Sequence, residues 1–136
     1  MNAKKIILGC RSLEKGKAAK KDIEETTNRA GVIEVWEVDL SSYESVKQFC
    51  ARVRTLDRLD VMLENAGVAT PYYQEAEGME STITVNVLST FLMALLVLPK
   101  LRESSIKFNI TPRLTIVASD AHEQVCTCLK AAKTIS

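Results

Sequence analysis

The sequence has no long hydrophobic run and few of the residues that mark special classes of protein. Its 136 residues include only 3 prolines, 5 glycines and 4 cysteines. The longest apolar run, residues 91–99, is far shorter than the roughly 20 residues that a membrane span needs. We therefore expect no membrane span. The 46% of hydrophobic residues excludes a wholly disordered chain and a collagen-like repeat.

The cysteines form no framework typical of disulfides or of a zinc site. They are Cys10, Cys50, Cys126 and Cys128. With His122, the last two form an H-x-x-x-C-x-C pattern, but no fourth ligand and no zinc signature accompany it. The apolar run after Lys5 ends at Gly9, which is too short for a signal peptide. These observations predict reduced thiols, a cytoplasmic protein and no bound metal.

The charges are nearly balanced, and the length suits one domain. There are 18 lysines and arginines against 17 aspartates and glutamates, which gives a net charge of +1. No overall basic character indicates a nucleic acid as a partner.

The hydrophobic pattern alternates between short strand-like runs and longer helical ones. Strands are expected at 5–10, 32–38, 59–63 and 114–118, and helices at 13–29, 41–53 and 79–102. Ser12 and the Ser41-x-x-Glu44 capping box are expected to begin the first two helices, and Gly31 to stop the first. Residues 68–78 are expected to be a loop, and Pro99 to break or kink the last helix near its end. This order predicts an α/β fold with parallel strands and right-handed crossovers.

Polar or small residues follow each expected strand, at the edge of the sheet where α/β proteins bind ligands. Arg11 could hold a 2′-phosphate through two hydrogen bonds, or it could be a solvated surface arginine. Asp39 could accept a hydrogen bond from an adenine amino group, or it could mark the start of the next helix. Ser119 could orient a substrate oxygen or form a local turn.

Two further features of the sequence allow more than one interpretation. Asn65, Ala66 and Gly67 could let the backbone approach a ligand closely, or they could form a simple turn. Asn86 lies within the apolar helical segment, where an amide either has a local partner or belongs to a site. The apolar surface of that segment could belong to the core or to a subunit interface.

Five segments of the chain together resemble the short-chain dehydrogenase/reductase family, and above all its retinol-dehydrogenase-like members common in fungi. They are IILGCRSLEKG, WEVDLSSYESVKQF, LDRLDVMLENAGVAT, ITVNVLSTFLMALLVLPKLRES and RLTIVASDAHE, which extend from residue 5 to about residue 123. The resemblance implies a Rossmann fold, in which a doubly wound parallel sheet binds NAD or NADP. It implies hydride transfer between the cofactor and an alcohol or ketone, with a role in fungal secondary metabolism as a further expectation.

The same resemblance implies roles for the candidate residues. Arg11 would select NADP, while Asp39 and Leu40 would contact adenine. Asn65, Ala66 and Gly67 would line the nicotinamide side of the site. Asn86 would belong to the proton relay, and Ser119 would orient the substrate oxygen. The helix expected at 79–102 would pack across a subunit interface.

The chain also departs from the family's pattern. The family's first strand and its T-G-x-x-x-G-x-G turn should precede Lys5, and the catalytic Y-x-x-x-K should follow Ser119, yet no tyrosine occurs after Tyr73. Many members have a second asparagine where this chain has Glu64. We therefore expect a partial Rossmann domain at 1–123, lacking the first strand with its glycine-rich turn and the C-terminal strands, and a divergent tail at 124–136.

These departures predict that the chain is inactive alone. An alternative is a non-catalytic fragment that pairs with a full-length relative, as a homo- or hetero-oligomer, through helix 79–102. In the family's strand order 3-2-1-4-5 the first strand is central. Without it, the two flanking strands are expected either to pair directly or to leave the sheet open.

Overall fold

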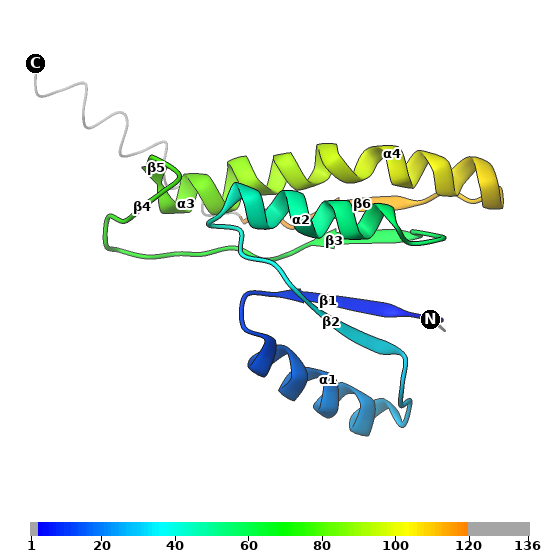
Figure 1. Ribbon diagram of the computed structural model, residues 1–136. Coiled ribbons are helices and arrows are strands. Elements are labelled where there is room, and N and C mark those ends of the chain that lie inside the picture. The colour runs from blue at the N-terminus through cyan, green and yellow to red at the C-terminus, as the bar shows by residue number, and fades with distance from the viewer. Residues whose placement is uncertain (1–2, 120–136) are drawn as a thin grey trace, which may run out of the picture.

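The structure is a computed structural model that describes residues 3–119 (Figure 1). Strands and helices alternate along most of the chain, as the sequence predicts. The strands are β1 (Ile6–Cys10), β2 (Ile33–Glu37), β3 (Val61–Glu64), β4 (Glu75–Ala76), β5 (Met79–Glu80) and β6 (Arg113–Ile116). The helices are α1 (Leu13–Thr27), α2 (Tyr43–Arg54), α3 (Ser81–Ile83), the π-helix η1 (Thr84–Ser89) and α4 (Thr90–Phe108).

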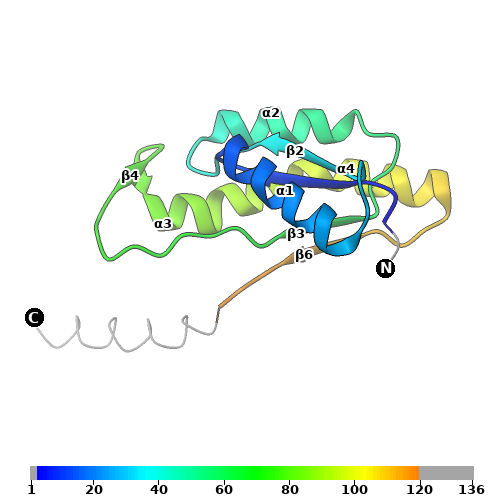
Figure 2. The ribbon, with the colours of Figure 1, turned by 90° about the horizontal axis from the view of Figure 1, so that it is seen from below.

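The four longer strands form two separate parallel pairs. β1 pairs with β2 from Ile6 opposite Ile33, and β3 pairs with β6 from Val61 opposite Arg113. All four run in the same direction (Figure 1), and Figure 2 shows their order as β2, β1, β3, β6. In the described part of the chain β1 and β3 are not hydrogen-bonded to each other. The parallel α/β character is confirmed, and of the two expected outcomes the structure shows the open one.

A shared layer of helices holds the two strand pairs together. α2 and α4 pack against each other over one face of the strands, while α1 packs on the opposite face of β1 and β2 (Figure 1). The core between them contains Trp36, Val38, Val46, Phe49, Cys50, Val53, Met93, Val97 and Leu101. Partly buried residues of β1, β3 and β6 pack against the same cluster: Ile7, Met62 and Leu114. Burial of this apolar surface stabilises the arrangement although no ladder joins the pairs.

The ends of α1 and α2 differ in detail from the prediction. α1 begins after Ser12 as expected, but it ends at Asn28, which has the left-handed φ of 53°, and not at Gly31. α2 begins after Ser42, whose hydroxyl oxygen accepts from the N–H of Ser45 at 3.4 Å. Ser41 is not the capping residue, because its hydroxyl donates to Asp39 instead.

The last predicted helix is longer than expected. It runs without interruption from Ser81 to Phe108, whereas residues 79–80 form β5, which pairs with β4 in a small hairpin inside the expected loop. Pro99 does not break the helix. It lies on the exposed side, and the carbonyl that loses its donor belongs to the 64% exposed Leu95, where water can replace the donor. By length and composition alone this helix could cross a membrane: an 18-residue window of it has a mean hydropathy of 2.0, and 39% of that window is buried. A core helix of a folded domain has the same properties.

Candidate functional site

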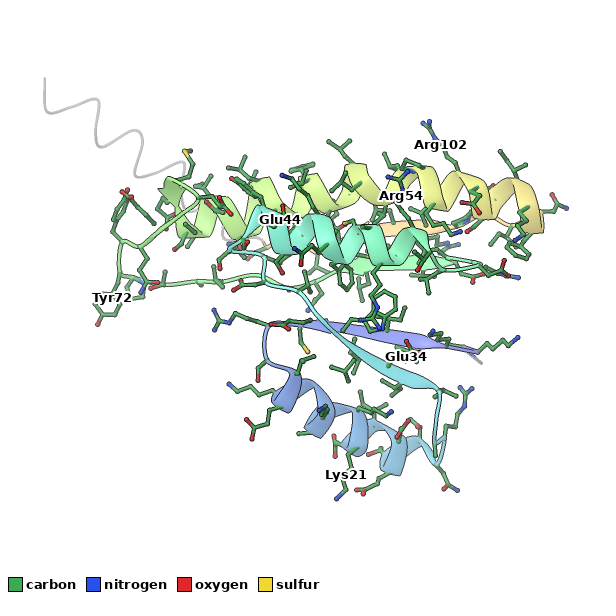
Figure 3. The ribbon with its side chains drawn as sticks, in the orientation of Figure 1. Lys21, Glu34, Glu44, Arg54, Tyr72 and Arg102 are labelled. Carbon is green, nitrogen blue, oxygen red and sulfur yellow. The ribbon has the colours of Figure 1, made fainter. Side chains whose placement is uncertain are left out.

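The candidate residues gather at one end of the molecule because all four parallel strands end there (Figure 1). Arg11 follows β1, Asp39 and Leu40 follow β2, and Asn65 to Gly67 follow β3. The exposed loop that contains Tyr72 lies at the same end (Figure 3). These segments therefore lie at one edge of the sheet, as the sequence predicts, while their roles there stay predictions.

Asp39 is fixed at the start of α2. Its Oδ1 accepts hydrogen bonds from the N–H of Ser41 at 2.9 Å and from the Ser41 hydroxyl at 2.7 Å. Partial burial alone would raise the pKa of Asp39, but these two hydrogen bonds and the charge of Arg11 lower it below the usual value. Asp39 thus makes the local contacts expected of a residue at a helix start. Both of these bonds use Oδ1.

Arg11 is exposed at the junction between β1 and α1. The next residue, Ser12, caps α1 by accepting from the N–H of Lys15 at 3.3 Å. Arg11 thus directly precedes the N-terminus of α1, where the helix dipole is positive, and its charge acts on Asp39. An anion at this position would meet two sources of positive charge.

The β2 corner and the long helix are tied together by a serine that the sequence analysis did not single out. The buried Ser89 donates from its hydroxyl to the carbonyl oxygen of Leu40 at 2.6 Å. The sequence could have indicated Ser89, because it is a small polar residue within an apolar helical segment. This bond fixes the end of η1 against the segment that carries Asp39 and Leu40.

Asn86 holds the segment after β3 in place. Its Oδ1 accepts from the N–H of Val68 and its Nδ2 donates to the carbonyl of Val68, both at 2.8 Å. A Cβ at Gly67 would lie 3.1 Å from the same Oδ1, so glycine permits this close approach. The partner of Asn86 is not a neighbour on its own helix but a backbone segment 18 positions earlier in the chain. Its role in a proton relay stays a prediction.

Replacing Asn86 with alanine is expected to release this segment. We expect hydrogen exchange at the Val68 amide to accelerate about 30-fold, because two hydrogen bonds of roughly 1 kcal/mol each are lost. Asn86→Asp should also accelerate exchange, because it puts an oxygen opposite the Val68 carbonyl. Gln48→Ala, which removes an exposed side-chain bond to Glu44, is the control. Unchanged exchange at Val68 in Asn86→Ala would contradict the clamp.

Ser119 is the last residue that the structure describes. The N–H of Val117, two residues earlier, donates to the carbonyl of Glu64 at 2.9 Å and extends the pairing of β6 with β3. Ser119 therefore follows the strand end that lies beside Asn65. The tail at 124–136, together with His122, Cys126 and Cys128, lies outside the described residues.

Glu64 is a buried carboxyl group directly before Asn65. It is 9% exposed, and neither of its carboxyl oxygens has a hydrogen-bond partner among the described residues. Burial raises the pKa of Glu64 to about 7. Burial, together with the charge of Glu64, also raises the pKa of the nearby Cys50 thiol to about 11. Cys50 is therefore a protonated core residue at neutral pH.

The other hollows on the described residues contain none of the candidate site residues. Two open hollows of about 430 and 320 Å³ lie along α1 and the outer edge of β2, and both are lined by Lys17 and Lys20. No group of three or more potential metal ligands occurs within residues 3–119.

Comparison with known sequences matches most of the chain to one family. A family model described as short chain dehydrogenase matches residues 1–110. A short chain dehydrogenase/reductase of Cryptosporiopsis sp. is 52% identical over 124 residues, which cover 90% of this chain and 38% of that protein. A short chain dehydrogenase of Emericella nidulans is 46% identical over 125 residues, which cover 90% of this chain and 40% of that protein. The chain thus spans about two fifths of these relatives.

Solved structures share the fold over part of their length. A short-chain dehydrogenase from Sphingobium yanoikuyae in complex with NADPH gives a TM-score of 0.68 at 24% identity and covers 85% of this chain and 44% of that one. A metagenomic short-chain oxidoreductase in complex with NADP gives 0.65 at 22% identity, with 85% and 51% covered. At these identities the likeness shows a partial Rossmann-like arrangement of strands and helices.

Proposed function

The chain belongs to the short chain dehydrogenase family, and from that premise we propose that it binds NADP as part of an oxidoreductase acting on a small alcohol or ketone. When bound as NADPH, the cofactor would supply a hydride to the carbonyl carbon of a ketone, and as NADP+ it would accept one from the carbon of an alcohol. The observation that carries the proposal is the exposed Arg11 at the capped start of α1, beside Asp39. A guanidinium and a helix N-terminus together suit a 2′-phosphate.

The other candidate residues fit the same proposal. In the proposal, Asp39 and Leu40 contact the adenine ring. Ser41 and Ser89 bond to these two residues and hold them in position. In the proposal, Asn65, Ala66 and Gly67 face the nicotinamide side, and Asn86 fixes the backbone that follows them. Ser119 would orient the substrate oxygen.

We propose that this chain binds the cofactor but does not catalyse the reaction by itself. The sequence has no tyrosine after Tyr73, so no Y-x-x-x-K can supply a general acid beside Ser119. We infer that the chain alone does not reduce ketones. A role in fungal secondary metabolism stays a prediction.

Adenosine 2′,5′-bisphosphate is expected to bind the chain, and Arg11→Ala to weaken that binding about tenfold or more by removing a charge-assisted hydrogen bond pair. Binding of 5′-AMP, which lacks the 2′-phosphate, should change little. Isothermal titration calorimetry with both ligands measures the difference.

Arg102→Ala is the matched control, because this exposed arginine lies on α4 away from the strand ends (Figure 3). A thermal melt of each variant verifies that it is folded. Equal affinity of the parent chain and Arg11→Ala for the bisphosphate would show that Arg11 is a solvated surface residue and would refute the cofactor role.

A second candidate function is association with another subunit through α4. Apolar residues of η1 and α4 are exposed: Leu88 of η1 at 38%, and Phe91, Leu95 and Ile106 of α4 at 57%, 64% and 85%. Together they form an apolar stripe, and such exposed stripes mark interaction surfaces. A second copy or a longer relative could cover this stripe, and this function does not require cofactor binding.

A further inference from the structure

A hollow of about 320 Å³ follows the outer edge of β2, the strand that Figure 2 shows farthest from β6. Among residues 3–119 β2 pairs only with β1, so no strand covers its other edge. We call this hollow the β2 groove. It is lined by residues 33–36 of the strand, by Lys17 and Lys20 of α1, and by Arg52 of α2. The groove therefore combines an open strand edge with positive charge from two helices.

The hydrogen bonds to β1 identify which backbone groups of β2 point outward. The carbonyl of Val32 accepts from the N–H of Ile6 at 2.8 Å, and the N–H of Val38 donates to the carbonyl of Cys10 at 3.0 Å. In a parallel ladder the N–H and C=O of one residue point to the same side, and successive residues alternate. Three residues of β2 therefore point both backbone groups away from β1: Ile33, Val35 and Glu37.

The chain itself neutralises little of the positive charge beside this edge. Lys17 and Arg52 are exposed, and neither makes an ion pair within the part of the chain that the structure describes. The guanidinium of Arg52 lies over the ring of Trp36, 3.8 Å from its centroid, which holds it beside the strand. Lys20 has one long contact, with its Nζ 3.9 Å from a carboxylate oxygen of Glu24.

The carboxylate of Glu34 in the lining already has partners. One of its oxygens lies 2.7 Å from the Nζ of Lys5, and the other accepts from the indole N–H of Trp36 at 3.0 Å. Its negative charge is therefore offset from outside the groove. Within the described residues the lining has three cations against this one carboxylate, so the groove is complementary to an anionic ligand.

We propose that the β2 groove is a docking surface for an extended, acidic segment of another polypeptide, which adds to the outer edge of β2 as a further strand. The main-chain hydrogen bonds to Ile33, Val35 and Glu37 give the affinity, as in other cases of β-augmentation. The cations of α1 and α2 select carboxylate side chains on the added strand, because they border it on both faces.

Other occupants use only part of what the groove offers. Pairing with the β2 edge of a second copy would bring the same cations of both molecules together, which is destabilising. A nucleic acid would use the cations but leave the backbone groups of the strand unpaired. An acidic peptide strand uses both. The proposal does not rest on cofactor binding, and its test needs no cofactor.

Binding of a synthetic peptide to the full 136-residue chain tests the proposal. The probe is acetyl-EVEVTVEVE-amide, which reads the same in both directions and so suits a parallel or an antiparallel strand. One control peptide has lysine in place of each glutamate, and the other has proline in place of the central threonine, which removes a ladder donor. By isothermal titration calorimetry we expect the probe to bind at least about tenfold more tightly than either control.

Hydrogen exchange locates the bound peptide. At saturating probe we expect exchange at the amides of Ile33, Val35 and Glu37 to slow at least about tenfold, because each N–H gains a partner. The lysine and proline peptides at the same concentration should leave these three amides unchanged.

Two variants of the same helix test the role of charge. Arg52→Glu is expected to weaken binding of the probe at least about tenfold. Arg54→Glu makes the same change of charge two positions along α2, on the side away from β2, and should bind like the parent chain (Figure 3). A thermal melt verifies that each variant is folded. If Arg52→Glu does not fold, Lys17→Glu on the exposed side of α1 replaces it.

Three results would overturn the proposal. The first is equal affinity for the acidic and the lysine peptides. The second is unchanged exchange at the three β2 amides, with or without protection elsewhere in the chain. The third is a folded Arg52→Glu or Lys17→Glu variant that binds the probe as tightly as the parent chain does.

Discussion

The free energy of unfolding is expected to fall by about 2–3 kcal/mol as the pH rises from 5 to 8, because Glu64 ionises within the core. The pKa of Glu64 is about 7 in the folded protein, against an ordinary value of 4.5. The folded state therefore holds this proton more tightly than the unfolded state. The stabilisation is complete below pH 4.5, and it is lost as the pH rises through 7.

Glu64→Gln is expected to remove this pH dependence, because an amide does not titrate. Urea unfolding at pH 5, 6, 7 and 8 measures the difference in slope between the variant and the parent chain. Glu34→Gln is the matched control. Glu34 is a strand carboxylate whose pKa is lowered by its hydrogen bond with Lys5 (Figure 3). The folded and unfolded forms of that group are both ionised above pH 5, so its removal should leave the slope unchanged.

A parent chain whose stability is constant from pH 5 to 8 would contradict the burial of an unpartnered carboxyl at Glu64. So would a Glu64→Gln variant that keeps the parent's slope. The expected effect is large because nothing among the described residues donates a hydrogen bond to either oxygen. A single hydrogen-bond donor to the Glu64 carboxylate would reduce this dependence of stability on pH.

Leu95→Glu is expected to weaken self-association of the chain about 100-fold, because an interface over the apolar stripe would bury an unpaired charge. Leu95 is 64% exposed, so the substitution should leave the folded monomer intact. Sedimentation equilibrium of the parent chain and the variant over a range of concentrations measures the change. The physical driving force is burial of the stripe formed with Leu88, Phe91 and Ile106.

Leu13→Glu is the matched control, because Leu13 is a 39% exposed leucine on α1, away from the stripe. It should associate like the parent chain. A parent chain that is monomeric at every concentration, alone and with a full-length relative, would contradict the interface. Partition of the parent chain into lipid vesicles in place of association would show instead that the stripe meets a membrane.

The succession of strands and helices was predictable because its signals are local. Short apolar runs with β-branched residues, such as those around Ile7 and Val35, alternate with helix-forming segments that begin at a serine. Parallel strands then place their carboxyl ends together, so Arg11 and Asp39 were predictable as neighbours of one edge. The resemblance to the family rests on the same local segments.

Several details were not predictable because they depend on competition between neighbouring groups. Ser41 and Ser42 are equally suited to begin α2, and the hydrogen bond from Ser41 to Asp39 leaves the cap to Ser42. Pro99 is tolerated because the buried side of the helix faces away from it. The β4–β5 hairpin forms over two residues on each side, too short for a periodic signal.

The sequence by itself determined the α/β class, the direction of the strands and the candidate residues at their ends, since each follows from local propensity and from the period of the apolar residues. Only the tertiary structure decided which partners those residues have. The clamp of Asn86 on Val68 spans 18 positions, and the bond of Ser89 to Leu40 spans 49. The burial of Glu64 likewise depends on tertiary packing. Contacts between distant segments depend on how the whole chain encloses its core, and no local pattern encodes them.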